Sequence, residues 1–153
     1  MKIRYLLAPA LAFSTALAMA VPTFAQDEDD SVANEKVFIG AELSGDQVTE
    51  GGAPGASGEF AAETTLASGQ LCYTLTVSGV DAPTAAHIHA GAEGVDGAPV
   101  VTLKITGDAK KNTCVPVAAD LLEKLINSPS DYYVNVHNEA HPAGAARGQL
   151  DYN

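Results

Sequence analysis

The chain has 153 residues and a formal net charge of −11, with 19 acidic residues against 8 lysines and arginines. This length suits one domain once an N-terminal leader is set aside. An acidic surface repels the phosphates of nucleic acids and of anionic lipids, so the composition excludes nucleic-acid binding and favours the approach of cations.

The N-terminal segment has the pattern of a Sec-type signal peptide. Two basic residues precede an apolar run over residues 5–20, and an A-x-A-like site follows. We assign residues 1–25 to the signal peptide and expect cleavage after Ala25, with a cut after Ala20 as the alternative. The mature protein is then periplasmic or secreted, with no membrane span.

Residues 26–35 are acidic and almost free of large apolar side chains, which predicts a disordered tail. From residue 36 onward, short segments alternate apolar and polar residues between Gly, Pro, Asn and Asp, and each predicts a strand. These segments are 36–43, 58–66, 71–80, 84–91, 99–106, 113–117, 131–138 and 145–153. The pattern therefore predicts an all-β domain over residues 36–153, either an antiparallel sandwich or a closed barrel.

One segment between the predicted strands has helical spacing. Leu121, Leu122, Leu125 and Ile126 repeat at the helical period, and Pro129 follows them. We expect one short amphipathic helix here.

Two cysteines, Cys72 and Cys114, remain in the mature chain. Behind a signal peptide such a pair predicts a disulfide. The bond would close a loop of about 40 residues and stabilise the fold by about 3–4 kcal/mol.

The segment "AAHIHAG" places His87 and His89 two positions apart. In a strand both point to one face, with Cα atoms about 6.6 Å apart, from which two imidazoles can bind one ion. In "YVNVH", alternation sends Val134 and Val136 inward and His137 to the opposite face. If the two strands are neighbours, three histidines share one face.

His141 follows in a loop that could fold back over the other three histidines. Neutral imidazoles suit Cu(II), Zn(II) or Ni(II) rather than Ca(II) or Mg(II), and we place copper before zinc. The alternative is that the histidines are outward-facing polar residues that bind carbonyls of the following turns and hold those loops in shape. The sequence requires no cofactor.

Three blocks of the sequence, "LCYTLTVSG", "AAHIHAGAEGVDGAPVV" and "YYVNVHNEAHPAGAARGQL", resemble the chordin-type (CHRD) domain and occur in that family's order. The likeness spans roughly residues 36–152. It implies a Greek-key or immunoglobulin-like sandwich or barrel in an extracytoplasmic protein. The family supplies no established biochemical activity for members that stand alone.

Shorter stretches, "HIHAG", "NVH" and "PAGAARGQL", resemble the metal-site motifs of Cu/Zn superoxide dismutases. By this likeness, His87, His89 and His137 look like copper ligands and Arg147 looks like the anion-guiding arginine. The bridging histidine and the zinc-binding loop have no counterpart, so the likeness implies at most a copper-only site.

The residues themselves offer Arg147 another role, an ion pair with Asp131, Glu139 or Asp151. We therefore expect first a non-enzymatic binding or structural module, whose partner is an unknown extracytoplasmic protein. The alternative is a copper protein that buffers or delivers metal, or carries out superoxide-type redox chemistry with Arg147 as its one catalytic side chain.

Overall fold

The structure, a computed structural model, describes residues 29–108 and 113–153. The signal peptide and cleavage site predicted for residues 1–25 lie outside the described residues. No helix in the described part of the chain is long and apolar enough to cross a membrane.

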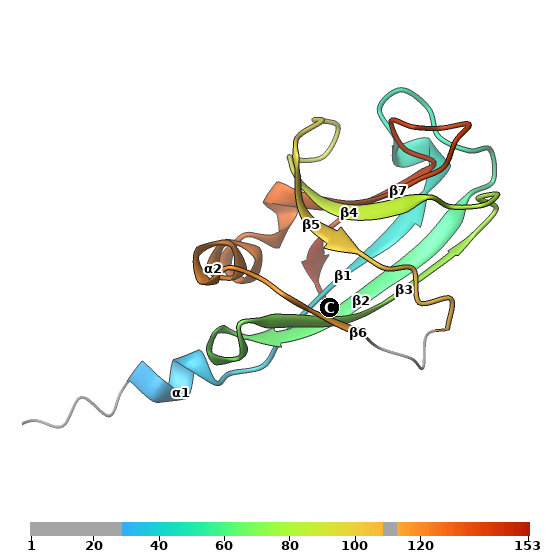
Figure 1. The fold of residues 1–153 in the computed structure, drawn as a ribbon. Helices are drawn as coiled ribbons and strands as arrows, with labels where there is room; N and C mark the ends of the chain where they lie inside the picture. The colour runs from blue at the N-terminus through green and yellow to red at the C-terminus, as the bar shows by residue number, and fades with distance from the viewer. Residues whose placement is uncertain (1–28, 109–112) are drawn as a thin grey trace, which may run out of the picture.

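The described strands form one antiparallel sheet (Figure 1). They are β1 (Val37–Ser44), β2 (Ser57–Thr65), β3 (Gln70–Ser78), β4 (Ala85–Ala90), β5 (Pro99–Leu103), β6 (Thr113–Pro116), β7 (Tyr132–His137), β8 (Ala146–Gln149) and β9 (Asp151–Tyr152). The helices are α1 (Asp29–Ala33) and α2 (Ala119–Asn127), with 3-10 turns at Gly45–Gln47, Leu66–Ser68 and Pro129–Asp131. The strand order is β5-β4-β7-β8-β1-β2-β3-β6, and β9 pairs with β1.

The sheet curls until its two ends nearly meet. The segment after β5 bonds to β3, because the backbone N–H of Thr106 donates to the carbonyl of Leu75 at 2.9 Å. The N–H of Lys104 likewise donates to the hydroxyl of Tyr73 at 2.6 Å. The strand predicted over 99–106 therefore ends at Leu103, and its last residues close the barrel instead. The all-β prediction is confirmed, in the form of a nearly closed barrel with a short helix.

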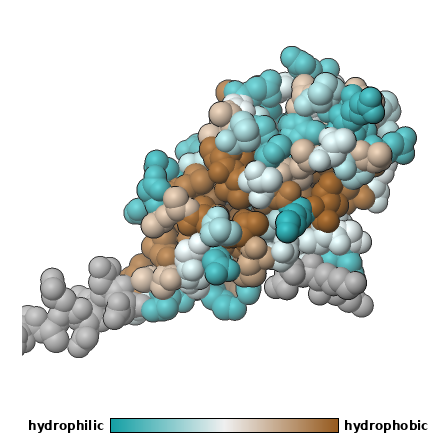
Figure 2. All heavy atoms as spheres, in the orientation of Figure 1, coloured by the Kyte–Doolittle hydropathy of each residue, from teal (hydrophilic) through white to brown (hydrophobic). Residues whose placement is uncertain are grey.

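The core lies inside this barrel. Alternate residues of each strand point inward, and Ile39, Phe60 and Ile88 are at most 1% exposed. The predicted helix is confirmed as α2, which buries Leu122 and Leu125 completely against the barrel. Figure 2 shows hydrophobic residues, in brown, in the middle of the face where β5 and β6 lie, and mostly hydrophilic residues over the loops at the top.

Cys72 of β3 lies directly opposite Cys114 of β6, and the two form a disulfide. The predicted pairing is confirmed. The bond ties the short edge strand β6 to the body of the sheet.

Two segments differ from the sequence-based expectation. The strand predicted over 145–153 is interrupted at Leu150, which is 1% exposed and joins the core, so the segment forms β8 and then β9. Within the tail predicted to be disordered, residues 29–33 form the short helix α1. A helix this short has little stability of its own, and Val32 within it is 60% exposed.

Candidate metal centre

The candidate site lies on the outer face of β4 and β7, which are antiparallel neighbours. Their register pairs His87 with Asn135 and Ala85 with His137, while Ile88 and Val134 point into the core. Because side chains alternate along a strand, His87, His89 and His137 share the outer face. The expectation that these three side chains share one face is confirmed.

The three rings form a compact cluster. The ring centroids are 5.3 Å apart for His87 and His137, 5.6 Å for His87 and His89, and 5.7 Å for His89 and His137. One ring nitrogen from each residue lies within 4.8 Å of the other two. His141 is not part of this group; its backbone N–H donates to the side chain of Asn138 at 2.8 Å.

Backbone carbonyls fix the orientation of two of the rings. The Nδ1 atom of His89 lies 2.9 Å from the carbonyl oxygen of Gly97, and Nδ1 of His137 lies 3.0 Å from that of Pro142. A carbonyl oxygen only accepts hydrogen bonds, so both Nδ1 atoms carry the proton and both Nε2 atoms keep a lone pair. This part of the arrangement fits the alternative in which the histidines hold the loops.

That alternative leaves three nitrogen atoms without a role. Nδ1 of His87, Nε2 of His89 and Nε2 of His137 are buried and have no hydrogen-bond partner. A buried polar atom without a partner costs about 1–3 kcal/mol. One unpartnered nitrogen from each ring is therefore available to a ligand.

Burial favours the neutral form of two of these rings, His87 and His137. It lowers the pKa of His87, and the neighbouring His89 lowers that pKa further. Burial also lowers the pKa of His137, an effect that the hydrogen bond to Pro142 only partly offsets. Neutral imidazole is the form that binds metal, so both rings are competent ligands at neutral pH.

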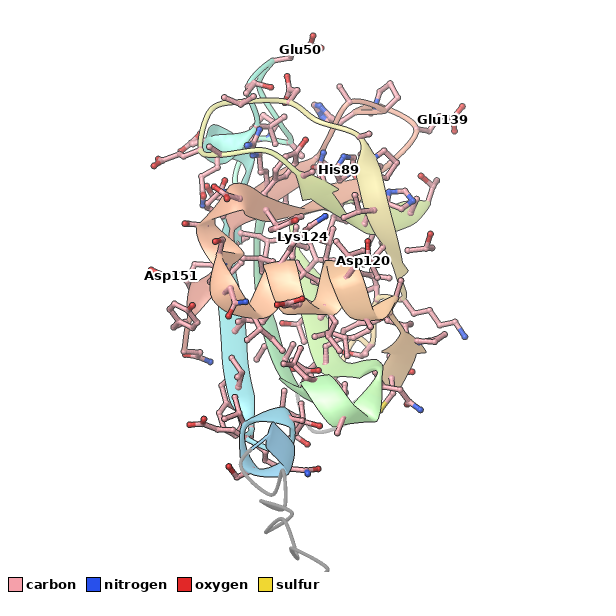
Figure 3. All side chains as sticks on the ribbon, turned by 90° about the vertical axis from the view of Figure 1, so that its left-hand side faces the viewer. Glu50, His89, Asp120, Lys124, Glu139 and Asp151 are labelled. Carbon is pink, nitrogen blue, oxygen red and sulfur yellow. A yellow bond between two sulfur atoms is a disulfide. The ribbon has the colours of Figure 1, made fainter. Side chains whose placement is uncertain are left out.

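The cluster opens into a cavity of about 670 Å³. The cavity is lined by the three histidines and by Thr84, Ala85, Pro99, Asn138, Glu139 and Pro142. Figure 3 shows His89 near the loop-bearing end of the molecule, below Glu50 and Glu139. Solvent and small ligands can therefore reach the histidines from one side.

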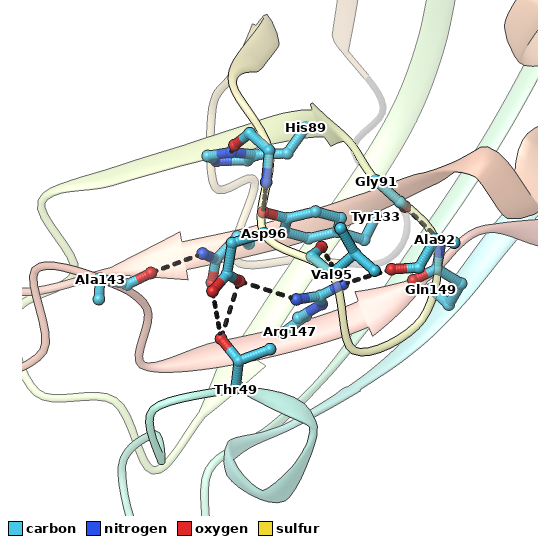
Figure 4. Close-up of polar contacts among 12 residues, drawn as sticks. Thr49, His89, Gly91, Ala92, Val95, Asp96, Tyr133, Ala143, Arg147 and Gln149 are labelled. Carbon is cyan, nitrogen blue, oxygen red and sulfur yellow. Dashed lines mark hydrogen bonds and ion pairs between the residues drawn. The ribbon is translucent and has the colours of Figure 1, made fainter.

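Arg147 does not line this cavity. Its side chain is almost fully buried, and its guanidinium donates to the carboxylate of Asp96 at 3.1 Å and to the carbonyls of Ala92 and Val95 at 3.0 Å each. Its Cζ also lies 3.6 Å from the centroid of the Tyr133 ring (Figure 4).

The ion pair expected for Arg147 exists, but with a different partner. The expectation of Asp131, Glu139 or Asp151 is wrong, and Asp96 takes that place. The reason is that β8 places Arg147 opposite Asn135 on the outer face of the sheet, where residues 91–98 fold over it.

Sequence reasoning missed the role of Tyr133. This residue lies on the outer face, where its ring stacks on that of His89 with centroids 5.0 Å apart. The signal was present in the alternation, because Tyr133, Asn135 and His137 occupy every second position of β7.

Together, the fold and the site define a disulfide-linked, barrel-like β-domain with a histidine cluster on its outer face. The family model of the CHRD domain matches residues 39–150, and the chain belongs to this family. The match confirms the resemblance seen in the sequence, and it includes the disulfide, the three clustered histidines and Arg147. No curated protein gives a significant match to the chain.

Proposed function

We propose that this protein is an extracytoplasmic metal-binding module that holds one transition-metal ion, copper(II) before zinc(II), through His87, His89 and His137. Two observations carry the proposal. One ring nitrogen from each histidine lies within 4.8 Å of the other two, and each ring has a buried nitrogen with no hydrogen-bond partner. The disulfide supports an oxidising compartment, since such bonds are rare in reducing ones.

The donor set favours copper and zinc. Three neutral imidazoles without a carboxylate or thiolate suit these ions, and copper binds nitrogen ligands more tightly than zinc does. Nitrogens bound at about 2.0–2.1 Å to one ion lie about 3–4 Å apart. The ring nitrogens, which lie within 4.8 Å of one another, therefore need to approach by about 1 Å on binding.

Metal buffering or delivery is favoured over superoxide chemistry. The guanidinium of Arg147 is already engaged by Asp96 and two carbonyls, so it is not free to attract an anion to the cavity. The net charge of −11 also repels an anionic substrate and attracts a cation.

The test is metal stoichiometry. Purified protein is titrated with Cu(II) and with Zn(II) against a competing chelator, and bound metal is measured per chain by elemental analysis. We expect one ion per chain in the wild type and its loss in His87→Ala, His89→Ala and His137→Ala. His141→Ala is the matched control and should retain the ion.

A different result would overturn the proposal. If the wild type holds no stoichiometric copper or zinc, or if the three variants bind as well as the control, the histidines serve only to hold the loops. The protein is then the non-enzymatic binding or structural module that the sequence also allowed.

A further inference from the structure

We propose that Arg147 is a positioning residue for the metal centre, which acts on His89 through residues 91–98 and through Tyr133. This inference rests on the proposed function. It concerns the geometry and affinity of the site rather than its existence.

The first route runs through the loop formed by residues 91–98. Arg147 binds Ala92 and Val95 through their carbonyls and Asp96 through its carboxylate. The next residue, Gly97, accepts the hydrogen bond from Nδ1 of His89 at 2.9 Å. The carbonyl oxygen of Gly97, which sets the tautomer of His89, therefore belongs to a loop that Arg147 holds against the sheet through hydrogen bonds.

The second route runs through an aromatic ring. Figure 4 shows Tyr133 between His89 and Arg147. The rings of Tyr133 and His89 are 15° from parallel, and the guanidinium lies 3.6 Å from the centroid of the Tyr133 ring. The Tyr133 hydroxyl also accepts the N–H of Gly97 at 3.1 Å. Both routes thus meet at Gly97 and His89.

These contacts require an arginine. Its planar guanidinium reaches a carboxylate, two carbonyls and an aromatic face at once, whereas an ammonium is a single point of charge. His137 is held separately, by Pro142. A change at Arg147 should therefore disturb one ligand of the three and leave the site partly assembled.

The experiment compares Cu(II) affinity and the Cu(II) electron paramagnetic resonance spectrum among variants. Outer partners of a metal-bound histidine typically contribute 10–100-fold to affinity. We expect Arg147→Lys to weaken Cu(II) binding by about that factor and to shift the g and hyperfine values. Asp96→Asn should give a smaller change in the same direction. Because the Asp96 side chain is 62% exposed, this variant folds even if Arg147→Lys does not.

Two controls separate positioning from stability. Glu63→Gln breaks the exposed ion pair with Lys36, away from the site, and should leave both readouts unchanged. Leu122→Ala lowers stability through α2 and should leave the copper spectrum unchanged. A role of Arg147 in stability alone would make Arg147→Lys resemble Leu122→Ala.

The outcomes distinguish the two proposals. If the wild type binds no copper, the metal-binding function itself fails. If the wild type binds copper and both Arg147→Lys and Asp96→Asn keep its affinity and spectrum, only the positioning role of Arg147 is overturned.

Discussion

The Nδ1 atom of His137 lies 3.0 Å from the carbonyl oxygen of Pro142, within a turn of the chain that folds back beside β7. Together with the equivalent bond from His89 to Gly97, it predicts the tautomers of the metal-free protein. His89 and His137 should both be protonated at Nδ1. Long-range ¹⁵N–¹H correlation spectra of the imidazole nitrogens measure this directly. Protonation of His137 at Nε2 would contradict the structure.

The lowered pKa values predict how stability depends on pH. Unfolded histidine titrates near 6.5, and burial lowers the pKa of His87 and of His137 in the folded protein. Between about 6.5 and those lower values, the unfolded state binds more protons than the folded state. The free energy of unfolding should therefore fall as pH drops below about 6.5, with no contribution from these rings above it.

Urea denaturation of the metal-free protein at pH 7.5 and pH 5.5 measures this effect. The double variant His87→Gln, His137→Gln should lose part of the pH dependence. His141→Gln, outside the cluster, should keep it. If the free energy of unfolding changes equally between pH 7.5 and pH 5.5 in the wild type and in the double variant, the two rings do not contribute to the pH dependence.

Gly97 is predicted to be essential for the geometry of the site. A Cβ atom at this position would lie 1.5 Å from the carbonyl oxygen of Ala90, so Gly97→Ala must displace the loop that holds His89. We expect weaker Cu(II) binding and a lower melting temperature.

Gly94 in the same loop provides the matched control. It has φ of +73° and open space around its Cβ position, so Gly94→Ala meets no clash and costs about 1 kcal/mol of backbone strain. Copper affinity should stay close to that of the wild type. Equal loss in both variants would mean that the loop tolerates no change, rather than that the contact of Gly97 matters.

Removal of the disulfide should lower stability without removing the site. The bond between Cys72 and Cys114 spans 42 positions, and the loss of such a cross-link costs about 3–4 kcal/mol. We expect Cys72→Ala, Cys114→Ala to unfold at a lower urea concentration and to bind copper with unchanged stoichiometry under conditions where it is folded. Urea denaturation and metal titration of the double variant check both parts.

Closure of the barrel can be tested at Tyr73. Its hydroxyl accepts the N–H of Lys104 at 2.6 Å, across the gap between β3 and the segment after β5. Tyr73→Phe leaves that N–H without its partner and should cost about 1–3 kcal/mol. Hydrogen exchange at the Lys104 amide should accelerate. Unchanged exchange would indicate that other bonds close the barrel.

The sequence predicted those features that follow from local alternation. The period of two within "AAHIHAG" and "YVNVH" was enough to place three histidines on one face, because strand geometry decides the direction of each side chain. The adjacency of β4 and β7 was an assumption at that stage. The helix over residues 119–127 was also predictable, since its leucines repeat at the helical period.

Long-range placement could not be predicted in the same way. Arg147 pairs with Asp96, which is 51 positions away, because residues 91–98 fold over β8, and no local pattern encodes that path. The interruption at Leu150 arises for a related reason. The chain turns this side chain into the core between two short strands, and only the closed barrel provides the space for it.

The histidines project from the outside of the barrel, whereas the residues between and opposite them, such as Ile88 and Val136, belong wholly to the interior. The candidate metal ligands and the core residues thus lie on opposite faces of the same two strands, β4 and β7. The ligand set can be exchanged without repacking the interior, so this scaffold is suited to acquiring, losing or changing a bound ion by substitution on its outer surface alone.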